Sequence, residues 1–226
     1  MNRIAILIPC YNEEKTVGEV IKDFGTNFPY ADIYIYDNNS TDNTAAVASS
    51  YATTYRVHIK QAPEQGKGNV VKQMFEEIDA DIYLLVDGDH TYHAKDGVKL
   101  IDGIMSQGYD VMLGDRLSKS YRNTNVRRFH GFGNKLVCDL VNLRYCGHIT
   151  DVMTGYRAMS RKFVNNINIA SKGFEVETEM CLYALKYKFL VSSVPITYTD
   201  RPTGSVSKLN TISDGFKVLK TIITYK

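Results

Sequence analysis

Short apolar runs alternate with longer amphipathic stretches along the first half of the chain. Residues 4–8 read Ile-Ala-Ile-Leu-Ile and stop at Pro9, and such unbroken runs are typical of strands buried on both faces. The pattern predicts strands at 4–8, 33–36, 55–60, 82–86 and 111–113, and helices at 14–28, 42–51, 66–78 and 95–107. This alternation predicts an α/β fold with a mostly parallel, Rossmann-like sheet, flanked by helices and joined by right-handed crossovers.

The second half of the chain is less regular. Its pattern predicts helices at 128–144, 175–186 and 211–225, and a strand at 189–198 that Pro195 interrupts. No repeat, low-complexity tract or linker separates the halves. We therefore expect one domain over residues 1–226, a length that buries about 70% of the unfolded surface.

Composition narrows the classes of protein to consider. The 27 basic and 25 acidic side chains give a net charge of +2, which excludes a polyacidic or histone-like chain, and no nucleic-acid-binding motif is present. No apolar run reaches the roughly 18 residues of a membrane span, and we expect no signal peptide ahead of the first strand. The four cysteines lack metal-site spacing, so we expect reduced thiols and a cytoplasmic location.

Polar loops follow four of the predicted strands, at residues 9–14, 37–41, 87–91 and 114–116. In parallel α/β sheets, ligands bind beyond the carboxyl ends of the strands. Because all four loops belong to that edge, we expect them to form one site.

Two aspartates, Asp87 and Asp89, directly follow a buried strand. Carboxylates this close repel each other unless a cation lies between them. Mg²⁺ and Mn²⁺ prefer oxygen ligands and share their remaining positions with a diphosphate. The pair therefore predicts a metal–diphosphate site, with a solvated turn as the alternative.

Asp37 and Lys67 are weaker candidates for ligand contact. A carboxylate at Asp37 suits a nucleobase or ribose, whereas residues 40–42 are expected to form an Asx turn and a helix cap. Lys67 lies between two glycines at a predicted helix start, where backbone N–H groups and an ammonium suit an anion. A flexible helix entry explains the same three residues equally well.

Basic side chains are concentrated after the fifth predicted strand. Residues 116–138 contain six basic and no acidic residues: Arg116, Lys119, Arg122, Arg127, Arg128 and Lys135. A second basic stretch holds Arg201 and Lys208. Both stretches are expected to face phosphate, either of a ligand or of a membrane. Asp151 and Glu177 are candidates for a general base, while Glu175 and Glu179 are expected on a solvated helix face.

The ordered set of motifs resembles family 2 glycosyltransferases with the GT-A fold. The resemblance rests on residues 8–14 (Ile-Pro-Cys-Tyr-Asn-Glu-Glu), 37–42 (Asp-Asn-Asn-Ser-Thr-Asp), 66–68 (Gly-Lys-Gly), 87–89 (Asp-Gly-Asp) and 114–116 (Gly-Asp-Arg). The second half resembles the dolichol-phosphate mannose synthase branch, or polyprenyl-phosphate glycosyltransferases. That part rests on residues 151–157 (Asp-Val-Met-Thr-Gly-Tyr-Arg), 173–179 (Gly-Phe-Glu-Val-Glu-Thr-Glu) and 201–208 (Arg-Pro-Thr-Gly-Ser-Val-Ser-Lys).

The resemblance implies a nucleotide-sugar half, residues 1–116, and an acceptor half, residues 117–226. It implies a UDP- or GDP-sugar donor held by Pro9, Tyr11, Glu13 and Asp37, and Mg²⁺ or Mn²⁺ on Asp87 and Asp89. It also implies that Arg116, with Arg127 or Arg128, meets an acceptor phosphate, and that Arg201 and Lys208 close over the diphosphate. The chain departs from this pattern twice: Thr91 replaces a frequent glutamine, and the spacing from Arg201 to Lys208 is one residue longer.

The balance of charges favours a lipid-phosphate acceptor. A sugar hydroxyl needs a general base, whereas a phosphate monoester is largely anionic at neutral pH, with its second pKa at about 6. We therefore expect metal-dependent, inverting transfer to a polyprenyl phosphate. One alternative is transfer to a sugar hydroxyl of a surface polysaccharide or glycolipid, with Asp151 or Glu177 as base. A non-catalytic nucleotide-sugar-binding module and a sugar nucleotidyltransferase are further alternatives.

The last predicted helix carries an apolar face beside basic residues. Phe216, Leu219, Ile222 and Ile223 share that face, and Lys217, Lys220 and Lys226 lie nearby. Such a helix suits the cytoplasmic surface of a membrane. Packing on the core or on a second subunit, as in a homodimer, is the alternative.

Overall fold

The computed structural model describes residues 2–118, 128–208 and 211–225, and the side chains of 128–132 and 211–212 lie outside that description. Within the described residues the strands are β1 (Ile4–Cys10), β2 (Asp32–Asp37), β3 (Val57–Gln61), β4 (Ile82–Leu85), β5 (Val111–Asp115), β6 (Arg157–Ser160) and β7 (Val191–Pro195). The helices are α1 (Val17–Asn27), α2 (Thr44–Ser50), α3 (Lys67–Glu77), α4 (Ala94–Met105), α5 (Arg128–Tyr145), α6 (Arg161–Asn166), α7 (Val176–Lys186) and α8 (Thr211–Thr224).

All these strands form one seven-stranded sheet in the order β3-β2-β1-β4-β6-β5-β7. Every neighbouring pair is parallel except the two that involve β6, which runs antiparallel to β4 and β5. The predicted single domain with a mostly parallel sheet is confirmed. The sequence pattern missed β6 because this strand has four residues and begins with a charged one, Arg157, whose side chain is fully buried.

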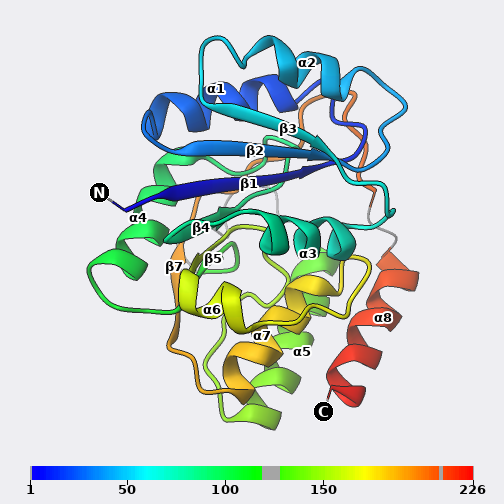
Figure 1. The fold of residues 1–226 in the computed structure, drawn as a ribbon. Coiled ribbons are helices and arrows are strands. Elements are labelled where there is room, and N and C mark those ends of the chain that lie inside the picture. The colour runs from blue at the N-terminus through cyan, green and yellow to red at the C-terminus, as the bar shows by residue number, and fades with distance from the viewer. Residues whose placement is uncertain (1, 119–127, 209–210, 226) are drawn as a thin grey trace.

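Helices cover both faces of the sheet (Figure 1), and an apolar core lies between the helices and the sheet on each face. On one face α1, α2 and α4 pack over alternate residues of the central strands, including Ile6, Ile8 and Leu84. On the other face α3, α5, α6, α7 and α8 pack over the residues between them, such as Leu7 and Leu85. Because β1 and β4 are buried on both faces, their sequences are unbroken apolar runs.

Several element boundaries differ from the predicted ones by one to three residues, and two of these differences have local reasons. Helix α1 begins three residues later than predicted because the Glu13 carbonyl first accepts backbone N–H groups from Thr16 and Val17 in a turn. Strand β7 ends at Pro195, which lacks a ladder donor. The chain beyond it returns to the sheet edge, where Tyr198 forms a single bridge with Tyr92.

Helix α8 only partly matches its predicted apolar face. Val218 and Ile222 are buried against α5 and α7, and Arg144 of α5 donates to the Ile222 carbonyl. Phe216 and Ile223 point away from this contact and are about 70% exposed, at 69% and 72%. Ile222 therefore belongs to the core, and Phe216 and Ile223 form the outer face. Among the described residues, no helix combines the length and apolarity needed to cross a bilayer.

Candidate active site

The polar loops predicted to meet do lie at one edge of the sheet. Strands β2, β1 and β4 are neighbours, with Cys10 opposite Asp37 and Leu7 opposite Leu85. Asp37 is the last residue of β2, and the segments that follow β1 and β4 carry Glu13 and Asp87. The 200–208 segment also returns to this edge, as its contacts with Glu13 and Asp89 show.

A buried lysine joins two carboxylates from different halves of the chain. The Lys67 ammonium lies 2.5 Å from Asp87 Oδ1 and 2.5 Å from Glu177 Oε1. The adjacent glycines allow this placement. Gly66 has a φ of 124°, and a Cβ on Gly68 would lie 2.1 Å from the Ser171 carbonyl oxygen. The helix start at Lys67 is confirmed, but the Gly68 N–H donates to the Lys172 carbonyl and the lysine points inward to carboxylates.

The neighbouring charges act oppositely on the two aspartates. Burial alone would raise the pKa of Asp87, but Lys67, together with Arg201 and Arg116, outweighs burial and lowers that pKa below its ordinary value. Burial and the charge of Asp87 together raise the pKa of Asp89 above its ordinary value. Asp89 is therefore the carboxylate that gains most from a nearby cation.

Both oxygens of Asp89 are engaged. Its Oδ1 accepts hydrogen bonds from the backbone N–H and the hydroxyl of Thr91, at 3.2 and 2.6 Å. Its Oδ2 lies 2.7 Å from Nη2 of Arg201. Thr91 therefore orients the aspartate, and this is the position where the sequence departs from the frequent glutamine of the family it resembles.

The 201–208 loop is anchored on the segment that follows β1. Arg201 Nη1 lies 3.4 Å from Glu13 Oε1, and Lys208 Nζ lies 2.8 Å from the same oxygen. Lys208 also donates to the Asn12 carbonyl at 2.7 Å, and Lys15 donates to the Gly204 carbonyl at 3.2 Å. The predicted basic loop therefore lies over the predicted donor and metal residues.

A second buried ion pair lies beside this cluster. Arg116 donates through Nε and Nη2 to both oxygens of Asp151, at 2.8 and 2.9 Å, and Asn134 donates to Asp151 at 2.6 Å. The Arg116 guanidinium also lies over the Tyr198 ring, 5.3 Å from its centroid. Burial raises the pKa of Asp151, and Arg116 reverses this, so the pKa lies below its ordinary value.

Asp37 has the features expected of a ligand contact. It ends β2, is only 4% exposed, and its buried Oδ1 has no hydrogen-bond partner in the described structure. The loop after it is fixed, since Asn38 Nδ2 donates to the Ala62 and Glu64 carbonyls. Asp42 accepts from the Thr44 N–H in the predicted Asx turn.

The oxygen donors at this edge suit a hard divalent cation. In the described part of the chain, however, no three His, Cys, Asp or Glu side chains are grouped as a metal site. Asp87 and Asp89 would supply two protein ligands at most, and the Thr91 hydroxyl is bonded to Asp89. This donor set fits a cation that takes its other ligands from a bound diphosphate and water, rather than a protein-only metal centre.

Of the remaining predicted residues of the site, two lie in the described part of the chain and the others lie partly or wholly outside it. Pro9 lies in β1 opposite Tyr36, and Tyr11, which follows this strand, is 37% exposed. Arg127, Lys119 and Arg122 lie outside the described residues, as does the side chain of Arg128 at the start of α5.

Sequence reasoning also missed several residues of the site and misplaced one. Glu179 is buried and accepts the backbone N–H groups of Ala170 and Ser171, so its predicted position on a solvated face is wrong. Asn134 and Tyr198, which contact the Asp151–Arg116 pair, carried no signal in the sequence. The Gly155 in the 151–157 motif was a usable signal, because it lies against Asp87.

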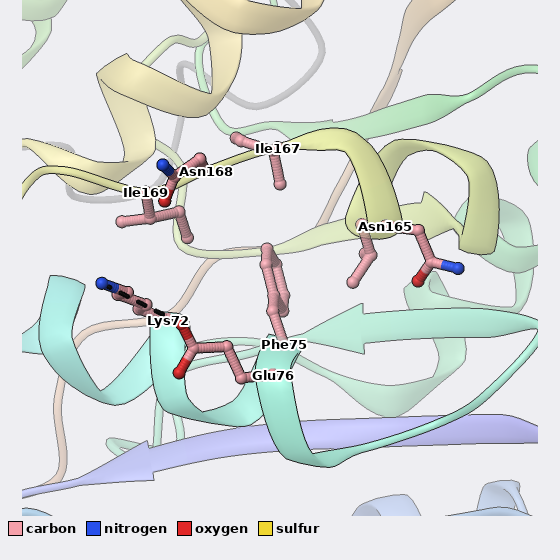
Figure 2. Close-up of a pocket in the computed structure, with 8 residues that line it drawn as sticks. Lys72, Phe75, Glu76, Asn165, Ile167, Asn168 and Ile169 are labelled. Carbon is pink, nitrogen blue, oxygen red and sulfur yellow. Dashed lines mark ion pairs between the residues drawn. The ribbon is translucent and has the colours of Figure 1, made fainter.

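A hollow of about 430 Å³ lies elsewhere, between α3 and the segment after α6 (Figure 2). Phe75, Ile167 and Ile169 line it, and Lys72 and Glu76 face each other across 3.9 Å at its border. None of the predicted site residues lines this hollow. It carries one exposed ion pair among mixed polar and apolar side chains, and no convergent catalytic groups.

Comparison with known proteins identifies the family. The model of glycosyl transferase family 2 matches residues 5–167. The chain belongs to this family. It is therefore a glycosyltransferase, and the predicted family is confirmed.

Individual relatives extend the match over most of the chain. Glycosyltransferase AglJ of Haloferax volcanii is 33% identical over 94% of this chain and 68% of its own length. Dolichol-phosphate mannosyltransferase of Pyrococcus furiosus is 26% identical over 92% of this chain and 59% of its own length. In fold, the chain resembles glucosyl-3-phosphoglycerate synthase of Mycobacterium tuberculosis, with a TM-score of 0.77, 17% identity, and coverage of 99% and 79% of the two chains. The predicted GT-A fold is confirmed.

Gly155 provides a test of the metal-site geometry. A Cβ at this position would lie 2.3 Å from Asp87 Oδ2, so Gly155→Ala must displace that carboxylate. We expect the rate of sugar transfer to fall roughly 100-fold, the order that a misplacement of about 1 Å costs. Gly215→Ala is the matched control, since a Cβ there meets nothing within 4 Å. Equal initial rates for the two variants would contradict this role of Gly155.

Proposed function

We propose that this glycosyltransferase moves a sugar from a nucleoside-diphosphate sugar to the phosphate of a polyprenyl phosphate, with inversion. The observation that carries the proposal is the state of the two candidate bases. Asp151 is held by Arg116, and Glu177 by Lys67. A carboxylate in a buried ion pair, with its pKa lowered as in Asp151, is a poor proton acceptor. An acceptor that is already anionic needs none.

Donor binding is assigned to the edge formed by β1, β2 and β4. The unpartnered Asp37 Oδ1 suits an N–H of the base or a ribose hydroxyl. Pro9 lies near the end of the adjacent strand, β1, and Tyr11 and Glu13 follow it. Asp87 and Asp89 would hold Mg²⁺ or Mn²⁺. When bound, this cation would neutralise charge on the leaving diphosphate. Arg201 and Lys208 would add two further positive charges there, and Lys67 fixes Asp87.

The transfer itself is a direct displacement. A phosphate oxygen of the acceptor forms a bond to the anomeric carbon as the bond from that carbon to the diphosphate oxygen breaks. The electron pair of the broken bond leaves with the diphosphate, where positive charge stabilises it. No proton has to be removed. Arg116, with Arg127 or Arg128, would hold the acceptor phosphate beside the anionic donor.

Relatives support this acceptor and the divalent cation. The name of the Pyrococcus furiosus relative gives dolichol phosphate as its acceptor, and the solved Mycobacterium tuberculosis synthase contains Mn²⁺ and UDP. We assign the donor to residues 1–116 and the acceptor to residues 117–226. We also place the outer face of α8, with Phe216 and Ile223 beside Lys220, on the membrane that contains the lipid, at the cytoplasmic surface because all four cysteines are free thiols. A homodimer through this face is the competing arrangement.

The acceptor assay compares two lipids that differ in one group. The protein is incubated with Mn²⁺, a panel of labelled UDP- and GDP-sugars, and vesicles that contain either polyprenyl phosphate or the matching polyprenol. We expect labelled lipid only with the phosphate, because the neutral alcohol would need a base. Oligosaccharides serve as the third acceptor. Equal transfer to the polyprenol, or transfer to oligosaccharides alone, would overturn the proposal. Sedimentation of the same vesicles reports whether the protein binds the membrane surface.

A further inference from the structure

Two cations of the chain itself lie on carboxylates of the proposed donor and metal residues, and one of these carboxylates, Asp89, is a proposed metal ligand. Arg201 lies between Asp89 and Glu13, and Lys208 lies on Glu13. These two cations and two carboxylates balance in charge. The side chains are mostly shielded from water, with exposures of 26% and 22% for the cations and 5% and 8% for the carboxylates. Low solvent exposure strengthens such pairs, so each cation is a real competitor for its carboxylate.

The contacts of Asp89 show what a metal ion must displace. Thr91 engages Oδ1 twice, so Oδ2 is the oxygen available for exchange, and Arg201 occupies it at 2.7 Å. Oδ1 is fixed by Thr91, which lies two positions away on the same turn, whereas Arg201 comes from the distant 201–208 loop. The arginine is therefore the partner that can leave without disturbing the turn.

We propose that Arg201 makes metal binding depend on the nucleoside diphosphate. Without nucleotide, the guanidinium holds Asp89 Oδ2 and excludes the cation. A diphosphate offers Arg201 an alternative anion, the guanidinium moves to it, and Asp89 becomes free for the metal. Each charge keeps a partner during this exchange, which avoids an unpaired buried ion. The inference rests on the proposed donor class, and it assigns Arg201 the role of a positioning residue for the metal.

The anchoring of the 201–208 loop explains how Arg201 can return to Asp89 after the nucleotide leaves. Lys208 donates to the Asn12 carbonyl and Lys15 to the Gly204 carbonyl. Neither contact involves Asp89, so both can persist while Arg201 changes partner. The exchange then needs only a side-chain movement within a loop that stays attached at two other points.

Binding of Mn²⁺ measured through the paramagnetic resonance signal of the free ion tests this without any turnover. In the wild type we expect UDP or GDP to strengthen Mn²⁺ binding at least tenfold, within the usual range of about 5- to 150-fold for coupled sites. In Arg201→Ala, Mn²⁺ should bind about tenfold more tightly without nucleotide, and the strengthening by nucleotide should be about tenfold smaller than in the wild type, because only direct coordination by the diphosphate remains.

Lys208→Ala is the matched control. It removes the same charge from the same loop but contacts Glu13 and Asn12, not Asp89. We expect its nucleotide-free Mn²⁺ affinity to stay within about threefold of the wild type. If both variants tighten Mn²⁺ binding equally, the effect comes from the overall positive charge of the loop and not from the contact with Asp89, and the inference is overturned. A thermal melt of each variant confirms that it is folded.

Failure of the inference differs from failure of the proposed function. If UDP or GDP strengthens Mn²⁺ binding equally in the wild type and in Arg201→Ala, and the nucleotide-free affinities agree, the inference is wrong and the donor class stands. If Arg201→Ala tightens Mn²⁺ binding but neither nucleotide has an effect on the wild type, the proposed donor class is wrong, and the exchange fails with it.

Discussion

Replacing Asp89 with asparagine is expected to lower the rate of sugar transfer by about 100- to 1,000-fold at saturating donor and metal, the usual cost of removing one group that stabilises developing charge. The amide keeps the shape of the side chain and still accepts from Thr91. It removes the negative charge at the oxygen that faces Arg201, and with it the affinity for a cation beside the leaving diphosphate. Initial rates of transfer to polyprenyl phosphate, the proposed acceptor, measure the effect.

The control for this variant is Asp102→Asn on α4. Asp102 is an exposed aspartate whose carboxylate accepts only from nearby Ser106 and Gln107 in the described structure, so its loss should leave the rate unchanged. Both variants should unfold at the wild-type temperature within a few degrees. If Asp89→Asn retains a third of the wild-type rate, the carboxylate does not take part in transfer.

The strand ends could be predicted from the sequence because they depend on local pattern. Apolar runs that stop at polar residues fix where β1, β2 and β4 end, and the topology of parallel sheets brings those ends together. Glu13, Asp37, Asp87 and Asp89 were therefore placed correctly at one edge. The gathering of carboxylates at this edge could therefore be predicted without knowing which side chains pair with them.

The partners of these carboxylates could not be predicted, because each comes from a distant part of the chain. Lys67 joins Glu177 across 110 positions, and Arg201 reaches Glu13 across 188. The hydrophobic periodicity of a sequence carries no information about such distant pairs. The same limit explains Glu179: an i, i+4 pattern with Glu175 is typical of a solvated face, but the 170–171 backbone supplies two N–H donors that hold the side chain inside.

The pair formed by Arg116 and Asp151 should be the most sensitive point for stability. Asp151 is 0% exposed and Arg116 is bonded to both of its oxygens. Arg116→Met leaves that carboxylate buried without its counter-ion, although the hydrogen bonds from the Asn134 amide and from the backbone N–H of residue 116 can persist. We expect the free energy of unfolding to fall by about 3–5 kcal/mol, the usual cost of breaking a buried pair. Urea unfolding at about pH 7 measures it.

The dependence of this loss on pH follows from the direction of the pKa shift. Because Arg116 lowers the pKa of Asp151 in the folded protein, the pair stabilises the fold above the unfolded-state pKa of about 3.9 and loses that effect as the pH falls. In Arg116→Met, burial instead raises this pKa, so Asp151 takes up a proton on acidification. The free-energy cost of burying an unpaired carboxylate then decreases. The stability difference between wild type and variant should therefore narrow from about pH 7 to about pH 4.5.

A double variant separates the structural role of the pair from contact with the acceptor phosphate. Arg116→Met combined with Asp151→Leu removes both charges, and it should recover much of the stability that the single change loses. If Arg116 also holds the acceptor, this restored protein will still need a higher concentration of polyprenyl phosphate for half-maximal rate. A single variant that loses less than about 1 kcal/mol, the range of exposed pairs, would show that the pair is not buried in solution.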